Sequence, residues 1–352
     1  MAGSTLVLVY ERPEDCLKRL IAEGHPAERA REIASYLAQS IDMEPELPAL
    51  EQACAERQIR FSAVTLDTYA ANLSDYQLEK TLVWTLTDGI AYFSGSVVPA
   101  FARLGMFRRV GSDDALFALC QDKFRSGAVL QALGIVVPPT ALTRNGTFIS
   151  PRHTIEDAAN WFVKPNRLGA KIGIYPDSHC HSIEDALALS RRIYSAYGDD
   201  AVVQSYVPGE NLRASWLDVD GTGDPEHLGT WLVRSGEDFQ TMTESLALYG
   251  ETGAQARSAG SYREPVLVDL ATENPGAAKA VLETTSRLVS GLGLRDVFSL
   301  DFRLGPDGRL TLLEFEVCPG LPCFDFRAYV KAMWGMTVPE AMAELAARKL
   351  AR

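Results

Sequence analysis

The sequence predicts an α/β protein built from more than one subdomain. Three observations lead to this prediction. Strand and helix patterns alternate near the N-terminus, and this alternation favours a parallel sheet. A strong β-hairpin pattern lies near the C-terminal end, where antiparallel pairing is expected. At 352 residues the chain is also too long for one small core.

The first third of the chain carries the alternating pattern. Strands are expected at 4–10, 59–66, 82–86 and 106–110, with helices after Pro13 and at 26–39, 47–57 and 96–104. Ser112 is expected to cap a helix that starts at Asp113. We therefore expect a first domain that spans residues 1–111.

The middle of the chain predicts two further subdomains, at 112–200 and 201–352. A helix at 122–133 should end at Gly134, and Ser182 should cap a second helix with one apolar face. Strands are expected at 161–165, 201–207, 212–219 and 228–233, the last two in an antiparallel series. A helix at 275–292 leads into the hairpin, and two helices, from Asp325 and Pro339, close the chain.

One long segment shows no periodic pattern. Residues 240–261 contain four glycines and few large apolar side chains. Long loops of this kind inside compact domains are often lids. We expect this segment to close over a bound ligand.

The predicted hairpin places acidic residues on neighbouring strands. Side chains alternate in a strand, so Ser299, Asp301 and Arg303 should share one face of the first strand. By the same alternation, Glu314 and Glu316 should share a face of the second strand with Leu310 and Leu312. Converging carboxylates favour a bound Mg²⁺, whereas a solvated hairpin edge would need none.

Lys164 ends an apolar strand directly before a glycine-containing loop. A buried lysine at this place would need an anion, and the backbone N–H groups of such a loop can hold phosphate oxygens. The alternative is a surface lysine beside an ordinary turn. The loop is not a Walker motif, because no Gly-Lys-Ser/Thr sequence follows it.

Composition and the remaining motifs exclude several classes. His179, Cys180 and His181 are expected to form a polar loop, since no second Cys/His pair lies near at ligand spacing. No Gly-x-Ser-x-Gly elbow supports a triad hydrolase.

The net charge of −12 argues against a nucleic-acid partner. No apolar run is long enough for a signal peptide or membrane span, and the six cysteines lack a framework spacing, so a cytoplasmic protein is expected.

Taken together, these motifs resemble the ATP-grasp superfamily, and within it the D-alanine–D-alanine ligases. The similarity covers residues 83–330, and its most specific part is C-terminal. It is carried by the ordered motifs at 122–126, 162–165, 168–173, 204–207 and 210, by the three hairpin acids, and by Pro319-Gly320 after them.

The resemblance implies a fold in which two subdomains clasp ATP beside the N-terminal parallel domain. It implies two Mg²⁺ ions, which Mn²⁺ can replace, on Asp301, Glu314 and Glu316. It implies small-molecule carboxylate and amine partners and allows a homodimer. The residues that it implies for ATP are Lys123, Lys164, Gly169, Ala170, Lys171, Gly173, Gln204, Tyr206, Val207 and Glu210.

The chain also departs from the family pattern. The family's arginine two residues before the metal aspartate is Ser299 here, so we expect Arg303 to supply that charge, with Lys164 as a second catalytic cation. The serine that binds the acceptor's carboxylate corresponds to Asp325, which would repel a carboxylate unless Arg327 or Arg303 compensates. The third metal position, usually asparagine, is Glu316.

The resemblance therefore implies an ADP-forming carboxylate–amine ligase that acts through an acyl phosphate. The N-terminal Gly-Gly-x-Ser-x-Glu turn of the D-alanine enzymes is replaced by Leu8-Val9-Tyr10-Glu11, so D-alanine is not the expected substrate. Two alternatives stay open. One is an ATP-grasp enzyme with another nucleophile, such as a carboxylase type, and the other is a nucleotide-binding protein without catalysis.

Overall fold

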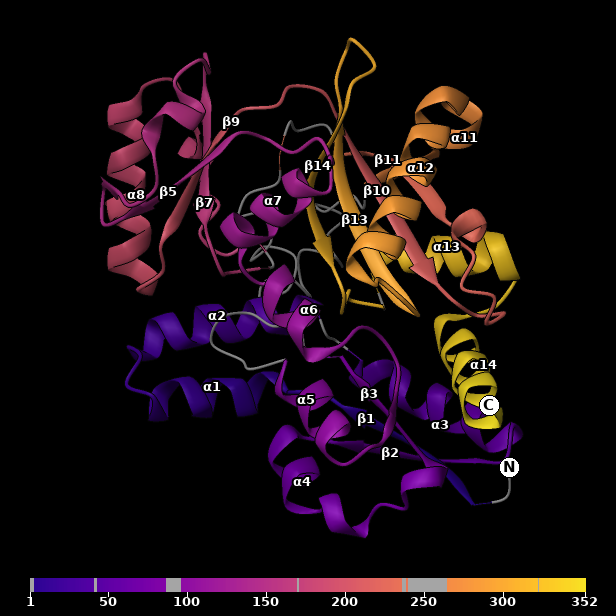
Figure 1. The fold of residues 1–352 in the computed structure, drawn as a ribbon. Helices are drawn as coiled ribbons and strands as arrows, with labels where there is room; N and C mark the ends of the chain where they lie inside the picture. The colour runs from indigo at the N-terminus through magenta and orange to yellow at the C-terminus, as the bar shows by residue number, and fades with distance from the viewer. Residues whose placement is uncertain are drawn as a thin grey trace, which may run out of the picture.

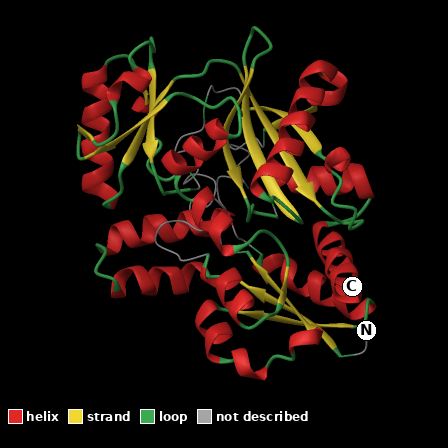
Figure 2. Ribbon diagram, in the orientation of Figure 1, coloured by secondary structure: helices red, strands yellow, loops and turns green. Residues whose placement is uncertain are grey.

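The computed structural model describes residues 3–40, 43–86, 96–169, 171–235, 239, 265–321 and 323–352. Three β-sheets form in this part of the chain, each with helices packed on it (Figure 1; Figure 2). The mixed α/β class predicted from the sequence is confirmed. The segment expected to be a lid, 240–261, and Ala170 lie outside the described residues. No helix within the described ranges is both long and apolar enough to cross a membrane.

The N-terminal sheet is parallel, with strand order β2-β1-β3-β4, as the alternating pattern predicts. Its strands are β1 (Ser4–Val9), β2 (Ile59–Val64), β3 (Thr81–Thr85) and β4 (Arg108–Arg109). The helices around it are α1 (Pro13–Ala22), α2 (Ala27–Ser40), α3 (Leu47–Glu56), α4 (Leu66–Ala71) and α5 (Val97–Leu104). Short 3₁₀ helices lie at Glu44–Glu46, Leu73–Asp75 and Leu78–Lys80.

The first helix after the N-terminal sheet begins one residue later than the sequence predicts. Helix α6 (Asp114–Cys120) is capped by Asp113, whose side chain accepts a hydrogen bond from the Leu116 N–H, so the expected cap at Ser112 is wrong. Helix α7 (Lys123–Ala132) is capped by Asp122 in the same way. Gly134 then follows with φ = 71°, the left-handed conformation that stops a helix.

The central sheet is antiparallel, with strand order β6-β5-β9-β7-β8. Its strands are β5 (Thr140–Arg144), β6 (Thr147–Phe148), β7 (Trp161–Pro165), β8 (His179–Cys180) and β9 (Ala201–Ser205), with 3₁₀ helices at Arg152–Ile155 and Pro176–Ser178. Helix α8 (Ile183–Tyr197) covers one face, and its Ser182 cap is confirmed.

The expected polar loop at 179–181 is wrong. His179 and Cys180 form strand β8, which pairs with β7, and Cys180 is only 3% exposed. The thiol behaves as a small apolar group and packs into the core beneath α8, which is a common place for a free cysteine. All six cysteines of the chain, each in a described range, are free thiols.

The C-terminal sheet is antiparallel, with strand order β12-β11-β10-β13-β14. Its strands are β10 (Glu210–Leu217), β11 (Gly229–Arg234), β12 (Val266–Asp269), β13 (Val297–Leu304) and β14 (Leu310–Glu316). The helices are α11 (Leu270–Glu273), α12 (Pro275–Leu292), α13 (Phe324–Trp334) and α14 (Val338–Ala351), with a 3₁₀ helix at Pro225–His227. The predicted hairpin of β13 and β14 is confirmed.

A β-bulge changes which side chains of β14 share a face. Asp301 pairs with Glu314, but the next residue, Phe302, pairs with Leu312, so Leu313 has no counterpart on β13. Cross-strand partners point to the same side of a sheet. Leu312 therefore faces the core with Phe302, while Glu314 faces the opposite side with Asp301. The single face expected for Leu310, Leu312, Glu314 and Glu316 is wrong, because an unbroken alternation would have buried the acids or exposed the leucines.

Helix α14 connects the C-terminal end of the chain to the N-terminal unit. It packs against α3, and the Arg57 Nε lies 3.1 Å from the Glu344 carboxylate. The Lys349 Nζ lies 2.6 Å from the Asp296 Oδ2, which also accepts a hydrogen bond from the Gly111 N–H at 2.7 Å. Asp296 is 5% exposed, so this carboxylate joins three segments in a nearly water-free place.

Lys349→Met should destabilise the protein, because it leaves the Asp296 carboxylate buried without its cation. We expect the free energy of unfolding to fall by about 1 to 3 kcal/mol. Lys279→Met is the matched control, since the Lys279 side chain is 78% exposed and lies 3.9 Å from Glu283. Chemical denaturation of both variants measures the difference, and equal midpoints would contradict the role of this contact.

Candidate active site

A cavity of about 250 Å³ lies between the central and C-terminal sheets. Lys164 of β7 and Gln204 of β9 line it from the central sheet. Arg213 of β10, Asp301 of β13 and Glu314 of β14 line it from the other side. The two sheets face each other across this cavity, above the N-terminal unit as drawn in Figure 1.

The described lining of the cavity carries more positive than negative charge. Four basic side chains and two carboxylates line it: Lys164, Lys171, Arg213 and Arg303 against Asp301 and Glu314. The whole chain has a net charge of −12, so the cavity reverses the overall sign. A locally positive cavity of this kind favours a polyanionic ligand.

Apolar side chains also line the cavity. They include Phe162, Ile174, Val233 and Leu313, together with the 204–207 segment. The rings of Phe162 and Phe239 meet edge to face, with centroids 5.0 Å apart. The Tyr206 ring, whose residue was expected at the nucleobase, stacks on His179 with centroids 3.8 Å apart. A planar apolar group such as a nucleobase therefore suits this lining.

Lys164 is buried as the sequence analysis required for an anion-binding lysine. Its side chain is 8% exposed, and its Nζ lies 3.4 Å from the Glu314 Oε2. Burial alone would raise the pKa of Glu314, but the charges of Lys164 and Lys123 outweigh it and lower the pKa to about 2. Since this pKa is depressed, the pair stabilises the fold above the ordinary carboxyl pKa and loses this contribution as the pH falls towards 2.

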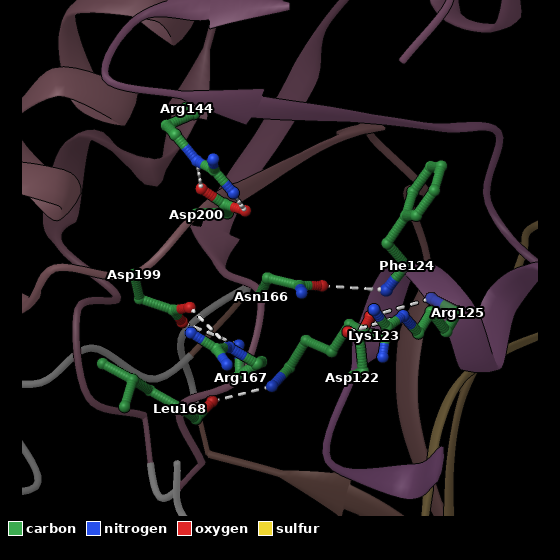
Figure 3. Close-up of polar contacts among 10 residues, drawn as sticks. All are labelled: Asp122, Lys123, Phe124, Arg125, Arg144, Asn166, Arg167, Leu168, Asp199 and Asp200. Atoms are coloured by element: carbon green, nitrogen blue, oxygen red, sulfur yellow. Dashed lines mark hydrogen bonds and ion pairs between the residues drawn. The ribbon is translucent and has the colours of Figure 1, made fainter. Parts of the chain in front are cut away.

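Polar contacts hold the loop after β7 against the N-terminal end of α7 (Figure 3). The Lys123 Nζ donates to the Leu168 carbonyl at 2.7 Å, and the Asn166 Oδ1 accepts from the Phe124 N–H at 2.9 Å. Asp199 accepts from the Arg167 N–H at 2.7 Å and pairs with its guanidinium at 3.2 Å. Lys123 therefore supports the loop that leads into the cavity.

The glycine-containing loop bends sharply back onto β7. Gly173 has φ = 73°, and a Cβ there would lie 2.5 Å from the Pro165 ring, so only glycine fits. Lys171 also has a positive φ of 64° and lines the cavity. The Ile172 N–H donates to the Gly169 carbonyl at 3.0 Å.

The hairpin brings together two of the three expected metal ligands. Asp301 and Glu314 are cross-strand partners that both line the cavity. Glu316 pairs instead with Ser299, and its Oε1 accepts from the Cys318 N–H at 3.0 Å. In the described ranges, no three His, Cys, Asp or Glu side chains lie close enough together to hold a metal ion. The oxygen donors of Asp301 and Glu314 suit Mg²⁺, which takes one or two carboxylates and phosphate oxygens.

Arg213, rather than the expected Arg303, lies next to Asp301 and Ser299. Its Nη1 lies 3.7 Å from the Asp301 carboxylate, its Nη2 donates to the Ser299 hydroxyl at 3.2 Å, and its Nε lies 2.9 Å from the Asp325 Oδ2. Sequence reasoning missed this residue. The signal was one arginine inside the mostly apolar strand pattern at 212–217.

Asp325 does not present a free charge to the cavity. It is fully buried on α13, bound by Arg213 and by the Ser215 hydroxyl at 2.7 Å. The partner that compensates its charge is Arg213, rather than either arginine considered from the sequence. Arg327 is exposed on the same helix, outside the cavity lining.

Arg303 and Glu210 lie at the outer end of the same sheet. The Arg303 Nη1 donates to the Gly209 carbonyl at 2.6 Å, and the residue is 5% exposed although it lines the cavity. The Glu210 carboxylate lies 3.0 Å from the Arg234 Nε. Arg303 and Glu210 are therefore held by partners other than Arg213, which contacts Asp301.

No family model matches the chain. A D-alanine–D-alanine ligase of Arthrobacter sp. is 25% identical over 248 residues, which are 68% of this chain and 60% of that protein. The solved D-alanine–D-alanine ligase of Bacillus anthracis, in complex with ATP, aligns over 99% of this chain and 98% of its own, with a TM-score of 0.64 and 12% identity. The chain has the ATP-grasp fold.

The resemblance to the D-alanine–D-alanine ligases, found first in the sequence, is confirmed. The ATP-grasp fold is also shared with the D-cycloserine synthetase DcsG, which aligns over 99% of this chain and all of that one, with a TM-score of 0.59 and 16% identity. In sequence, the chain spans about three fifths of the length of the curated relatives that it matches.

Asp199→Ala should loosen the loop after β7. Asp199 is 3% exposed, so its removal leaves the partly buried N–H of Arg167 without its acceptor and breaks the ion pair, at a cost of about 1 to 3 kcal/mol in unfolding free energy. The neighbouring Asp200→Ala is the control, because Asp200 pairs with the exposed Arg144 and such pairs contribute about 0 to 1 kcal/mol. Denaturation midpoints decide between them, and equal losses would contradict the anchoring role.

Proposed function

We propose that the protein is an ATP-dependent ligase that joins a small-molecule carboxylate to an amine. The observation that carries the proposal is the cavity between the two antiparallel sheets, whose lining combines apolar side chains with an excess of positive charge. Apolar side chains suit a nucleobase and an excess of positive charge suits a triphosphate. The ATP complex known for a structural neighbour with the same fold supports this arrangement.

In this proposal the substrate carboxylate attacks the γ-phosphate of ATP, which gives an acyl phosphate and ADP. Lys164 and Lys171 line the cavity where phosphate oxygens would lie, and Lys123 supports the loop above them. Gln204, Tyr206 and Val207 also line the cavity, and we expect them to contact the base. Phosphoryl transfer needs positioning and charge stabilisation more than acid–base groups, and this lining offers both.

Asp301 and Glu314 are the proposed ligands for Mg²⁺, with Mn²⁺ as a substitute. Bound there, the divalent ions would neutralise charge on the phosphates. Asp301 and Glu314 are already paired with Arg213 and Lys164. When the metal–nucleotide complex binds, Lys164 and Arg213 would exchange these contacts for phosphate or substrate oxygens, while Arg213 keeps its contacts with Asp325 and Ser299. Glu316 would need to turn away from the Cys318 N–H to join them as the third ligand.

Of the two alternatives, a protein without catalysis is the less supported. That alternative rested on Ser299, where the family's arginine is missing. Arg213 places a guanidinium beside Ser299 from the neighbouring strand, so the positive charge is retained. An ATP-grasp enzyme with a different nucleophile differs only in the acceptor, and an acceptor panel separates it from an amine ligase.

We further propose that the acceptor is not plain D-alanine. A serine at the Asp325 position would offer a hydroxyl to an acceptor carboxylate. Asp325 is instead fully buried, and its charge is used to bind Arg213. The chain therefore lacks this hydrogen-bond donor for an α-carboxylate.

Glu314→Gln tests the metal assignment. ATP should bind the wild type only with a divalent ion, because the triphosphate otherwise faces Asp301 and Glu314. The variant should lose at least about 100-fold in ADP release, since a neutral amide is a poor Mg²⁺ ligand. Glu283→Gln, on the exposed face of α12, is the control. Calorimetric titration should detect ATP binding to the wild type in Mg²⁺ but not in EDTA. Normal ADP release by Glu314→Gln would contradict the metal assignment.

Asp325→Ser tests the acceptor class. The wild type should prefer amines without an α-carboxylate, and the variant should shift the preference towards α-amino acids by roughly tenfold, because a hydroxyl is gained and Arg213 is released. The measurement is ADP release with matched amines, such as ethylamine against D-alanine, expressed as a ratio for each protein. A wild type that prefers D-alanine, with no shift in the variant, would show that the idea is wrong.

A further inference from the structure

Arg213 is a cation of the cavity lining to which the proposed function gives no specific substrate atom. It lies on β10 opposite Asp301 of β13, so both side chains lie on the same face of the sheet. Its side chain is 26% exposed and lines the cavity beside Phe324. Arg213 is therefore supported from behind and open towards the ligand space.

Two side chains hold the guanidinium at the edge of the cavity. The Asp325 Oδ2 on α13 lies 2.9 Å from Nε as an ion pair, without the alignment of a hydrogen bond, and accepts a hydrogen bond from the Ser215 hydroxyl at 2.7 Å. The Ser299 hydroxyl accepts from Nη2 at 3.2 Å. The ion pair and this hydrogen bond together keep the guanidinium near the start of α13.

The positive charge is stable in this place. Arginine keeps its charge in proteins, and the carboxylates of Asp325 and Asp301 lie 2.9 Å and 3.7 Å from the Arg213 nitrogens. The carboxylate of Asp325 balances the arginine, and it is fully buried, so water does not screen the pair from behind. The cation can therefore serve a developing anion in the cavity without being lost to solvent.

We propose that Arg213 binds the acyl oxygen of the substrate and stabilises its negative charge, and that Asp325 and Ser299 position Arg213 for this. The inference rests on the proposed ligase function. The amine nitrogen attacks the acyl carbon, and the C=O electron pair moves onto the oxygen beside Arg213. The pair then returns to re-form the carbonyl, the C–O bond to phosphate breaks, and the nitrogen's proton leaves with the phosphate.

Arg303, the candidate from the sequence, is less suited to this task. Its Nη1 donates to the Gly209 carbonyl at 2.6 Å and the residue is 5% exposed. Lys164 is paired with Glu314, which places it with the nucleotide phosphates in the proposed function. Arg213 joins Asp301 on one side to α13 on the other, and so lies between the metal ligand and the remaining cavity wall.

The test removes the charge without leaving a buried ion. Arg213→Gln combined with Asp325→Asn replaces the ion pair by two neutral amides, so the fold should survive, as its thermal midpoint will report. Turnover with Mg²⁺ and ATP, followed as ADP release with a panel of small carboxylic acids and hydroxylamine as the amine, should fall about 100- to 1,000-fold. ATP binding should stay within about threefold of the wild type.

A second variant moves the charge instead of removing it. Arg213→Ser combined with Ser299→Arg places the guanidinium on the neighbouring strand, within reach of the same Asp325. It should recover turnover to within about tenfold of the wild type, which a merely structural role would not explain. Arg103→Gln is the control, because Arg103 forms an exposed pair with Asp114 outside the cavity.

The outcomes separate this inference from the proposed function. Turnover of the charge-free variant within about threefold of the wild type would overturn the inference alone, as would a relocated variant as inactive as the charge-free one. If the wild type releases no ADP with any acid, the proposed function fails and binding decides. Acetyl phosphate should then bind the ADP-loaded wild type roughly tenfold more tightly than the charge-free variant. Equal binding would overturn the inference.

Discussion

Each of the two carboxylates in the described lining of the cavity is paired with a cation from another strand. Glu314 is matched by Lys164 across the gap between the two sheets, and Asp301 by Arg213 within its own sheet. Charges in a partly buried place are costly unless they are paired, so these contacts constrain how the two sheets can approach each other. A ligand that brings both divalent cations and phosphates can exchange partners with all four groups at once. Neither a free metal ion nor a free triphosphate can do so alone.

The direction of the carboxylates depends on one irregularity in β14. With an unbroken alternation, Glu314 would share a face with Leu312, and that face packs into the core beneath α12. The extra residue, Leu313, turns Glu314 to the cavity while Leu312 stays buried. The bulge therefore lets one short strand serve both the hydrophobic core and the charged site.

The sequence predicted most of the elements and part of the site, for identifiable physical reasons. The hairpin follows from turn residues between two apolar strands. The sequence left Lys164 either buried or at the surface, and the structure shows it buried. The bulge could not be predicted, because alternation alone contains no signal for an inserted residue. The Arg213–Asp325 pair could not be predicted either, since it joins residues 112 positions apart through the register of β10, the turn after β14 and the placement of α13.

The position of Arg213 shows how a charge can keep its place in space while its place in the sequence changes. Neighbouring strands lie about 4.8 Å apart, which is less than the length of an extended arginine side chain. A guanidinium can therefore reach the same point above Asp301 from β13 or from β10. From the motif alone, Ser299 indicates that a cation has been lost. In the structure, the Ser299 hydroxyl accepts a hydrogen bond from the guanidinium of Arg213, so a cation is present. The acidic residue at position 325 has the same cause. The side chain of Arg213 extends from β10 towards the first turn of α13, where Asp325 provides its counter-ion.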